Sequence, residues 1–167
     1  MIIWFPITMW VLAIFFAGVS FGRAPKPRSA RTLFEALIRY IMLFPVGIMG
    51  LWGALGHLAF PEQTAASIGW TPSPFQFEVG VCNLGVGVVG VIAAYHRDWN
   101  FRLSLALFTL FFLGGAAWGH VIQMMSAGNF APGNAGPIFY TDILTPVSLL
   151  ILLALTRPPA APKSAAA

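Results

Sequence analysis

The fold class is decided by the stretch FQFEVGVCNLGVGVVGVIAAY, residues 75–95, whose only charged side chain is that of Glu78. A helix that crosses the hydrocarbon core of a bilayer needs about 20 consecutive, mostly apolar residues. Four further stretches of this kind lie on either side of it, over about residues 1–21, 33–60, 101–126 and 137–156. The sequence therefore predicts an all-α polytopic membrane protein, with a five-helix transmembrane bundle that forms a single domain over residues 1–157.

The composition of the whole chain agrees with this interpretation. Hydrophobic residues make up 58% of the chain and charged residues 8%, and the mean hydropathy is +0.80. A soluble domain carries about 25% charged residues. Cys82 is the only cysteine, so no disulfide can form within the chain. The composition excludes an ordinary soluble protein, and we expect the lipid bilayer, and no nucleic acid, as a partner.

The basic residues predict the orientation of the five helices. Nine Lys and Arg residues lie near the first and third connections or after the last helix: Arg23, Lys26, Arg28, Arg31, Arg39, Arg97, Arg102, Arg157 and Lys163. The connections around residues 61–74 and 127–136 contain none. Because cytoplasmic loops carry an excess of Lys and Arg, we predict an inner (plasma) membrane protein with its N-terminus outside and its C-terminus in the cytoplasm. The Pro/Ala-rich residues 158–167 are predicted to be a disordered tail.

Small residues mark the faces on which the helices are expected to approach one another closely. One face of the helix at 75–95 is small and polar, and so should pack inward: it holds Gln76, Gly80, Asn83, Gly87 and Gly90. Further glycines lie in the second and fourth helices: Gly47, Gly50, Gly53, Gly56 and the small-xxx-small pair Gly115 and Gly119. Ser73 is a predicted N-cap, with Gln76 completing a capping box. Glu35 and Arg39 have the i, i+4 spacing of a helix ion pair.

Polar side chains within membrane spans are costly, and those of this chain fall at similar depth. Under the predicted topology they gather in the outer half of the bundle and form a predicted ligand pocket: His57, Glu78, Asn83, His120, Gln123 and Asp142. Each also has a purely structural interpretation. A carboxylate such as Glu78 suits a helix N-terminus, and His57 or His120 could simply form hydrogen bonds across helices.

The chemistry of this pocket is left open by the sequence. His57, Glu78, His120 and Asp142 are candidate ligands of a transition metal such as zinc, iron, manganese or copper. Met124 adds a soft ligand that would suit copper(I). Bis-histidine haem is a further option, as is an imidazole or carboxyl group that moves protons for a quinone or another lipophilic substrate. The sequence selects no cofactor and does not decide whether the protein is an enzyme.

Several runs of residues resemble a known family. They are GIMGLWGALGH (47–57), IGWTPSPFQFEVG (68–80), GGAAWGH (114–120) and NFAPGNAG (129–136), followed by Asp142. Over about residues 40–150 they resemble an uncharacterised family of small bacterial inner-membrane proteins, a domain of unknown function, which implies a membrane location and no activity. Gly56-His57-Leu58 and Glu78-Val79-Gly80 are more loosely similar to DoxX-like membrane proteins, some of which are linked to quinone-coupled sulfur oxidation.

Three functions are compared on this basis. The first is an outer-facing pocket that binds a metal or a small lipophilic ligand, with redox chemistry as one option. The alternative is an accessory or structural subunit of a larger membrane complex with no chemistry of its own. The partners considered beside the lipid bilayer are such a complex or further copies of the chain in a homo-oligomer. A transporter ranks last, because the polar residues end about halfway through the bilayer and no inverted repeat is visible. The Gly/Pro-rich loop 129–136 is expected to fold back over the outer mouth.

Overall fold

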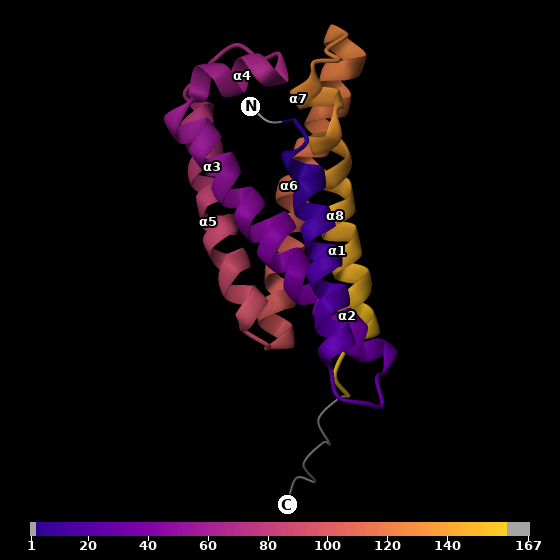
Figure 1. The fold of residues 1–167 in the computed structure, drawn as a ribbon. Coiled ribbons are helices and arrows are strands. Elements are labelled where there is room, and N and C mark those ends of the chain that lie inside the picture. The colour runs from indigo at the N-terminus through magenta and orange to yellow at the C-terminus, as the bar shows by residue number, and fades with distance from the viewer. Residues whose placement is uncertain (1–2, 160–167) are drawn as a thin grey trace, which may run out of the picture.

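The structure, a computed structural model, describes residues 3–159, and every regular element within that range is a helix. Five helices are long and apolar enough to cross a membrane, as the sequence predicts. They are α1 (Phe5–Arg23), the composite helix Ala30–Ala59, α5 (Phe75–Tyr95), α6 (Trp99–Ala127) and α8 (Pro137–Leu155), the last preceded by the short α7. Figure 1 shows them as an elongated bundle. Residues 160–167 of the predicted tail lie outside the described residues.

The second span is built from three consecutive segments. They are α2 (Ala30–Ile41), the π-helical segment η1 (Met42–Ile48) and α3 (Met49–Ala59). Pro45 lies inside η1 and has no N–H to donate to the preceding turn. The wider turns of a π-helix carry the chain past this residue without ending the helix. In Figure 1, α3 leans away from α1 and α8 and runs beside α5.

Helices α3 and α5 are in backbone contact along their glycine faces. A methyl group at Gly50 would lie 2.7 Å from the backbone nitrogen of Gly87. One at Gly90 would lie 2.8 Å from the nitrogen of Gly47, so the close contact of α5 continues from α3 into η1. The predicted inward face of α5 is confirmed, because Gln76, Gly80, Gly87 and Gly90 are all buried. The small-xxx-small pair in α6 plays no such part, since a methyl group at Gly115 or Gly119 would meet nothing within 4 Å.

The hydrophobic core lies towards the end of the bundle that is at the bottom of Figure 1. It contains fully buried side chains from α1, α2, η1 and α8, among them Ala13, Ile38, Met42, Val46, Leu149 and Leu153. Near the same end, the indole Nε1 of Trp99 donates a hydrogen bond of 2.9 Å to the carbonyl of Leu153, which joins α6 to α8. The helices are therefore closely joined at this end of the bundle.

Two short helices cover the opposite end, α4 (Pro61–Ile68) and α7 (Pro132–Ala135) (Figure 1). They touch each other closely, because a methyl group at Gly133 would lie 2.5 Å from the carbonyl oxygen of Ser67. Gly69 ends α4 with φ of +78°, a conformation that favours glycine. Loop 129–136 thus folds back onto the bundle, and we call α4 and α7 together the cap.

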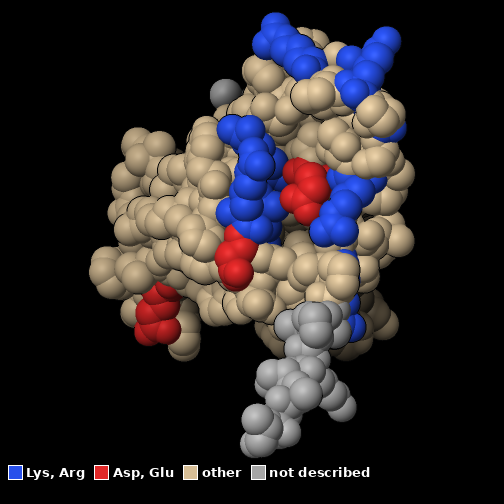
Figure 2. All heavy atoms as spheres, turned by 90° about the horizontal axis from the view of Figure 1, so that it is seen from below, with Lys and Arg blue, Asp and Glu red and all other residues tan. Residues whose placement is uncertain are grey.

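Lys and Arg side chains gather at the end of the bundle away from the cap (Figure 2). Arg102, which is 3% exposed, places its Nη1 2.9 Å from Oε2 of Glu35. This contact corrects the prediction of a Glu35–Arg39 pair. The guanidinium of Arg39 lies instead over the ring of Tyr95, at 5.1 Å from its centroid. The Glu35 carboxylate pairs across helices because Arg102 is buried beside it, whereas the Arg39 guanidinium lies against an aromatic ring.

Candidate functional site

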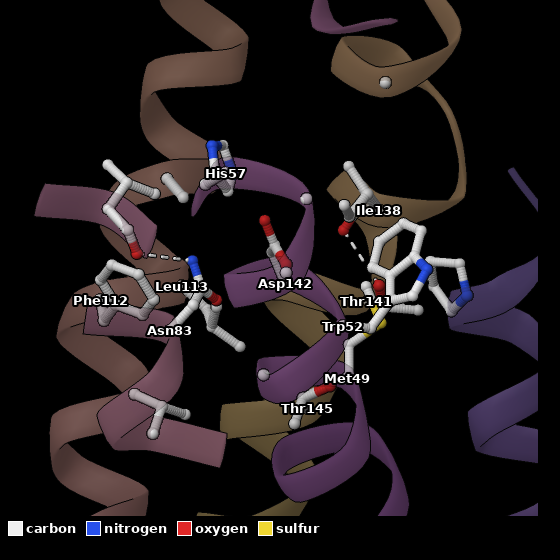
Figure 3. Close-up of a pocket in the computed structure, with 18 of the residues that line it drawn as sticks. Met49, Trp52, His57, Asn83, Phe112, Leu113, Ile138, Thr141, Asp142 and Thr145 are labelled. Carbon is white, nitrogen blue, oxygen red and sulfur yellow. Dashed lines mark hydrogen bonds between the residues drawn. The ribbon is translucent and has the colours of Figure 1, made fainter. Parts of the chain in front are cut away.

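A cavity of about 300 Å³ lies inside the bundle beneath the cap (Figure 3). Side chains from α1, the second span, α4, α5, α6 and α8 line it, and so does Gly133 of α7. Its walls are mainly apolar and include three indole rings, those of Trp10, Trp52 and Trp70. The site is therefore enclosed by nearly every element, which explains why no single sequence motif describes it.

Four of the predicted pocket residues line this cavity: His57, Asn83, His120 and Asp142. They come from α3, α5, α6 and α8, respectively. Figure 3 shows His57, Asn83 and Asp142 around one common space. Nε2 of His120 lies 3.9 Å from Oδ2 of Asp142, beyond hydrogen-bond distance. The structure thus places two imidazoles and one carboxyl group at the same cavity.

His120 is held from behind by the cap. Its Nδ1 lies 2.7 Å from Oδ1 of Asn134. Nδ2 of Asn134 donates to two backbone carbonyls, that of Asn129 at 2.9 Å and that of His120 itself at 3.2 Å. Asn134 is fully buried, and the indole of Trp70 stacks on the His120 ring with 6.0 Å between centroids. The position of this imidazole therefore depends on the cap.

The side-chain amide of Asn129 joins the loop that leads into α7 to the end of α4. Nδ2 of Asn129 donates to the carbonyl of Ile68, at the end of α4, over 2.9 Å. Its Oδ1 accepts from the backbone N–H of Ala131 at 3.1 Å. One side chain thus joins the connection after α6 to α4, and the loop that the sequence predicts as a cover is anchored in place.

His57 and Asn83 each use part of their hydrogen-bonding capacity within the protein. Nδ1 of His57 contacts Oε1 of Gln76. Nδ2 of Asn83 donates to the carbonyl of Val79 at 2.9 Å, which leaves its Oδ1 as an acceptor. The predicted capping role of Gln76 is not observed, because α5 begins after Pro74 without a side-chain cap. Gln76 instead orients an imidazole at the cavity.

Glu78 and Gln123 are not among the residues that line the cavity. Glu78 is exposed in the first turn of α5. It lies two residues from Gln76, which places it about 200° around the helix and so on the opposite face. Gln123 lies one turn beyond His120 towards the end of α6. The pocket predicted from depth alone therefore includes two residues, Glu78 and Gln123, that do not line the cavity.

The four predicted metal ligands are not assembled by the structure. Within residues 3–159, no group of three or more His, Cys, Asp and Glu side chains is placed to hold a metal ion. His120 and Asp142 approach each other, but Glu78 lies outside the cavity lining and His57 does not complete a group with them. A protein zinc site uses three or four protein ligands. The cavity holds three such side chains, His57, His120 and Asp142, but they do not come together as a ligand set.

A comparison with family models supplies the family. The model described as "Family of unknown function (DUF6790)" matches residues 3–161. The chain belongs to the DUF6790 family. The match takes in α1, and so it is longer than the resemblance over residues 40–150. The comparison with curated proteins and the comparison with solved structures found no match. Likeness to DoxX-like proteins stays a prediction, and membership of DUF6790 supplies no activity.

Sequence reasoning misses several residues that build the site of this DUF6790 protein, either by holding its histidines or by lining the cavity. Asn134 and Gln76 form hydrogen bonds to the two histidines. In the sequence, Asn134 is interpreted as a loop residue and Gln76 as part of a capping box at a helix N-terminus. Thr64 of α4 and Thr145 of α8 line the cavity with almost no exposure, 3% and 2%. A partial signal exists for Asn134, because a polar residue inside a Gly/Pro-rich loop suggests side-chain to backbone bonding. Nothing in the local sequence indicates that its partner is His120.

Proposed function

We propose that this DUF6790 protein is an integral membrane protein that binds a small lipophilic molecule with a polar head in the cavity beneath the cap. The observation that carries the proposal is the composition of the cavity wall. About 300 Å³ of space is surrounded by apolar and aromatic side chains, and His57, His120 and Asp142 meet it from separate helices. Small-molecule sites have this character, with volumes of roughly 300–1,000 Å³ and few polar groups.

The hydrogen bonding of Asp142 supports a ligand rather than a polar core. Its side chain lines the cavity and makes no hydrogen bond to the described residues, although the residue is only 9% exposed. Buried polar side chains in proteins are nearly always hydrogen-bonded. A polar group that enters the cavity would supply the missing partner. The apolar walls would meanwhile receive the hydrophobic body of the same molecule.

The membrane orientation follows from the charges and belongs to the same proposal. Lys and Arg gather away from the cap (Figure 2), and cytoplasmic loops are the ones enriched in these residues. We place the basic end in the cytoplasm and the cap on the outer side of a plasma membrane. The ligand would then enter the cavity from the outer half of the bilayer.

The cavity can be blocked without altering its polar groups. Ala116 lines the cavity, whereas the adjacent Gly115 is exposed and faces open space. Ala116→Phe should fill the cavity, and Gly115→Phe should leave it empty. We expect probes built on one compact cage, 1-adamantanol and 1-adamantylamine, to bind the wild type and Gly115→Phe in nanodiscs. Calorimetric titration should detect no binding to Ala116→Phe.

Cooperative thermal unfolding of both variants would establish that they are folded, which the comparison of their binding requires. Equal binding of these probes to Ala116→Phe and Gly115→Phe would place them outside the cavity and contradict the proposal. Absence of binding to the wild type would contradict it as well.

A further inference from the structure

We infer that the head group bound in this cavity is a protonated primary amine, held between Nε2 of His120 and the carboxylate of Asp142. The inference rests on the proposed ligand site and names the chemical class of its ligand. It follows from three properties of the cavity: which nitrogen of His120 carries the proton, how far apart the two acceptors are, and what charge the wall contributes.

The first property is set by Asn134. Its Nδ2 faces two carbonyl oxygens, those of Asn129 and His120. Turning the amide over would place Oδ1 against these acceptors, so the amide orientation is fixed. Oδ1 therefore faces Nδ1 of His120 and must accept a hydrogen bond from its N–H, so Nδ1 carries the proton. In the neutral imidazole, the other nitrogen, Nε2, then presents a lone pair, and it is this atom that faces Asp142.

The second property is the spacing of the acceptors. Nε2 of His120 and Oδ2 of Asp142 are 3.9 Å apart, with no donor from the described residues between them. For a donor atom about 2.9 Å from both acceptors, the acceptor–donor–acceptor angle would be roughly 85°. An ammonium group has protons near the tetrahedral angle and can point one at each acceptor with little bending. A hydroxyl group has one proton and can satisfy only one of the two.

The third property is charge. The lining contains no Lys or Arg among the described residues, so with Asp142 ionised and His120 neutral the cavity would carry one uncompensated negative charge. The other titratable side chain in the wall is His57, whose Nδ1 is engaged by Gln76. A buried carboxylate without a counter-charge is strongly unfavourable. A ligand ammonium supplies both the donors and the charge, whereas a water molecule supplies donors alone.

Aromatic side chains add a further contribution in the same direction. Indoles of Trp10, Trp52 and Trp70 line the cavity from α1, α3 and the connection after α4. Trp70 also stacks on His120. Cations are attracted to the faces of aromatic rings, and most strongly to tryptophan. The wall therefore favours an organic cation over an anion.

The test compares three probes that carry different polar groups on the same hydrophobic adamantane cage. Their binding is measured by calorimetric titration into phosphatidylcholine nanodiscs that contain the protein. The probes are 1-adamantylamine, 1-adamantanol and N,N,N-trimethyl-1-adamantylammonium. We expect the primary amine to bind about tenfold or more tightly than either of the others, because only it combines a positive charge with N–H donors for both acceptors. Asp142→Asn should remove this preference. Glu78→Gln, a matched change at an exposed carboxylate outside the cavity, should keep it.

The outcomes separate this inference from the proposed function. An alcohol or trimethylammonium probe that binds as tightly as the amine would overturn the amine inference and leave the ligand site standing. An amine preference that persists in Asp142→Asn would also overturn it. Absence of binding for all three probes would instead count against the ligand site itself.

Discussion

The side-chain amide of Asn134 links a short helix of the cap to an imidazole inside the membrane span. It bonds Nδ1 of His120 and two backbone carbonyls, and it is fully buried. Such an amide fixes both the position of the ring and the nitrogen that carries its proton. The orientation of His120, and the nitrogen that it presents to the cavity, are therefore set by a residue that does not line the cavity itself.

Replacing Asn134 should be costly. Asn134→Leu leaves the Nδ1–H of His120 and the carbonyl of Asn129 without these partners, and each buried polar group left unpaired costs roughly 1–3 kcal/mol. We expect a clear loss of thermal stability in detergent, against little change for the matched Asn100→Leu, because Asn100 is exposed in the first turn of α6.

The proton position can be observed directly. In the wild type, the ¹⁵N NMR signals of neutral His120 should report protonated Nδ1 and bare Nε2. The opposite tautomer would contradict the hydrogen-bond assignment and remove the first step of the amine inference.

Single-residue arguments from the sequence succeed for some site residues and fail for others for one geometrical reason. Depth in the bilayer groups His57, His120 and Asp142 with Glu78, and three of these four line the cavity. Glu78 does not, because depth says nothing about direction around a helix. Its angular position relative to Gln76 could have been derived from the sequence, whereas the pairing of Asn134 with His120 depends on tertiary folding.

At the level of elements, α3 and α5 owe their contact to glycine. Gly50→Ala should destabilise the protein by about 1–3 kcal/mol, because the added methyl group would lie 2.7 Å from the backbone of Gly87 and backbone cannot give way cheaply. Gly85→Ala is the matched change, in α5 with nothing within 4 Å. It should be neutral or stabilising by about 0.5–1 kcal/mol, since alanine favours helices.

Unfolding of the two variants in mixed detergent measures both effects. The informative result is the opposite sign of the two changes. Equal effects at Gly50 and Gly85 would mean that helix propensity, and not close packing, governs this pair of helices.

Elements were predictable from the sequence where one physical requirement dominates. A run of about 20 apolar residues has few alternatives to a membrane-spanning helix, so the five long helices are evident. The segment η1 is different, because a proline such as Pro45 predicts a disturbance without saying whether the helix kinks, breaks or widens. Helices α4 and α7 are short, and their Pro- and Gly-rich sequences resemble ordinary turns.

For the whole molecule, the distribution of charge makes a prediction about orientation. Ser126 and Asn100 are exposed near opposite ends of α6. In a Cys82→Ala background, Ser126→Cys should react with a membrane-impermeant maleimide in intact cells. Asn100→Cys should react only after the membrane is permeabilised.

The reverse labelling pattern would place the cap and its cavity on the cytoplasmic side. It would contradict the orientation derived from Lys and Arg, while leaving the described contacts within the bundle unchanged.

The π-helical segment η1 also determines the angular register of half of a span. Every residue of an α-helix turns the chain by about 100°, so losing one residue from Met42–Ile48 would rotate α3 as a body relative to α2. His57 would then turn away from the cavity, and Gly50 would turn away from Gly87. Substitutions within this apolar segment can be absorbed locally, but a change in its length cannot. Among members of this family, we expect the number of residues between α2 and α3 to vary less than the identity of those residues.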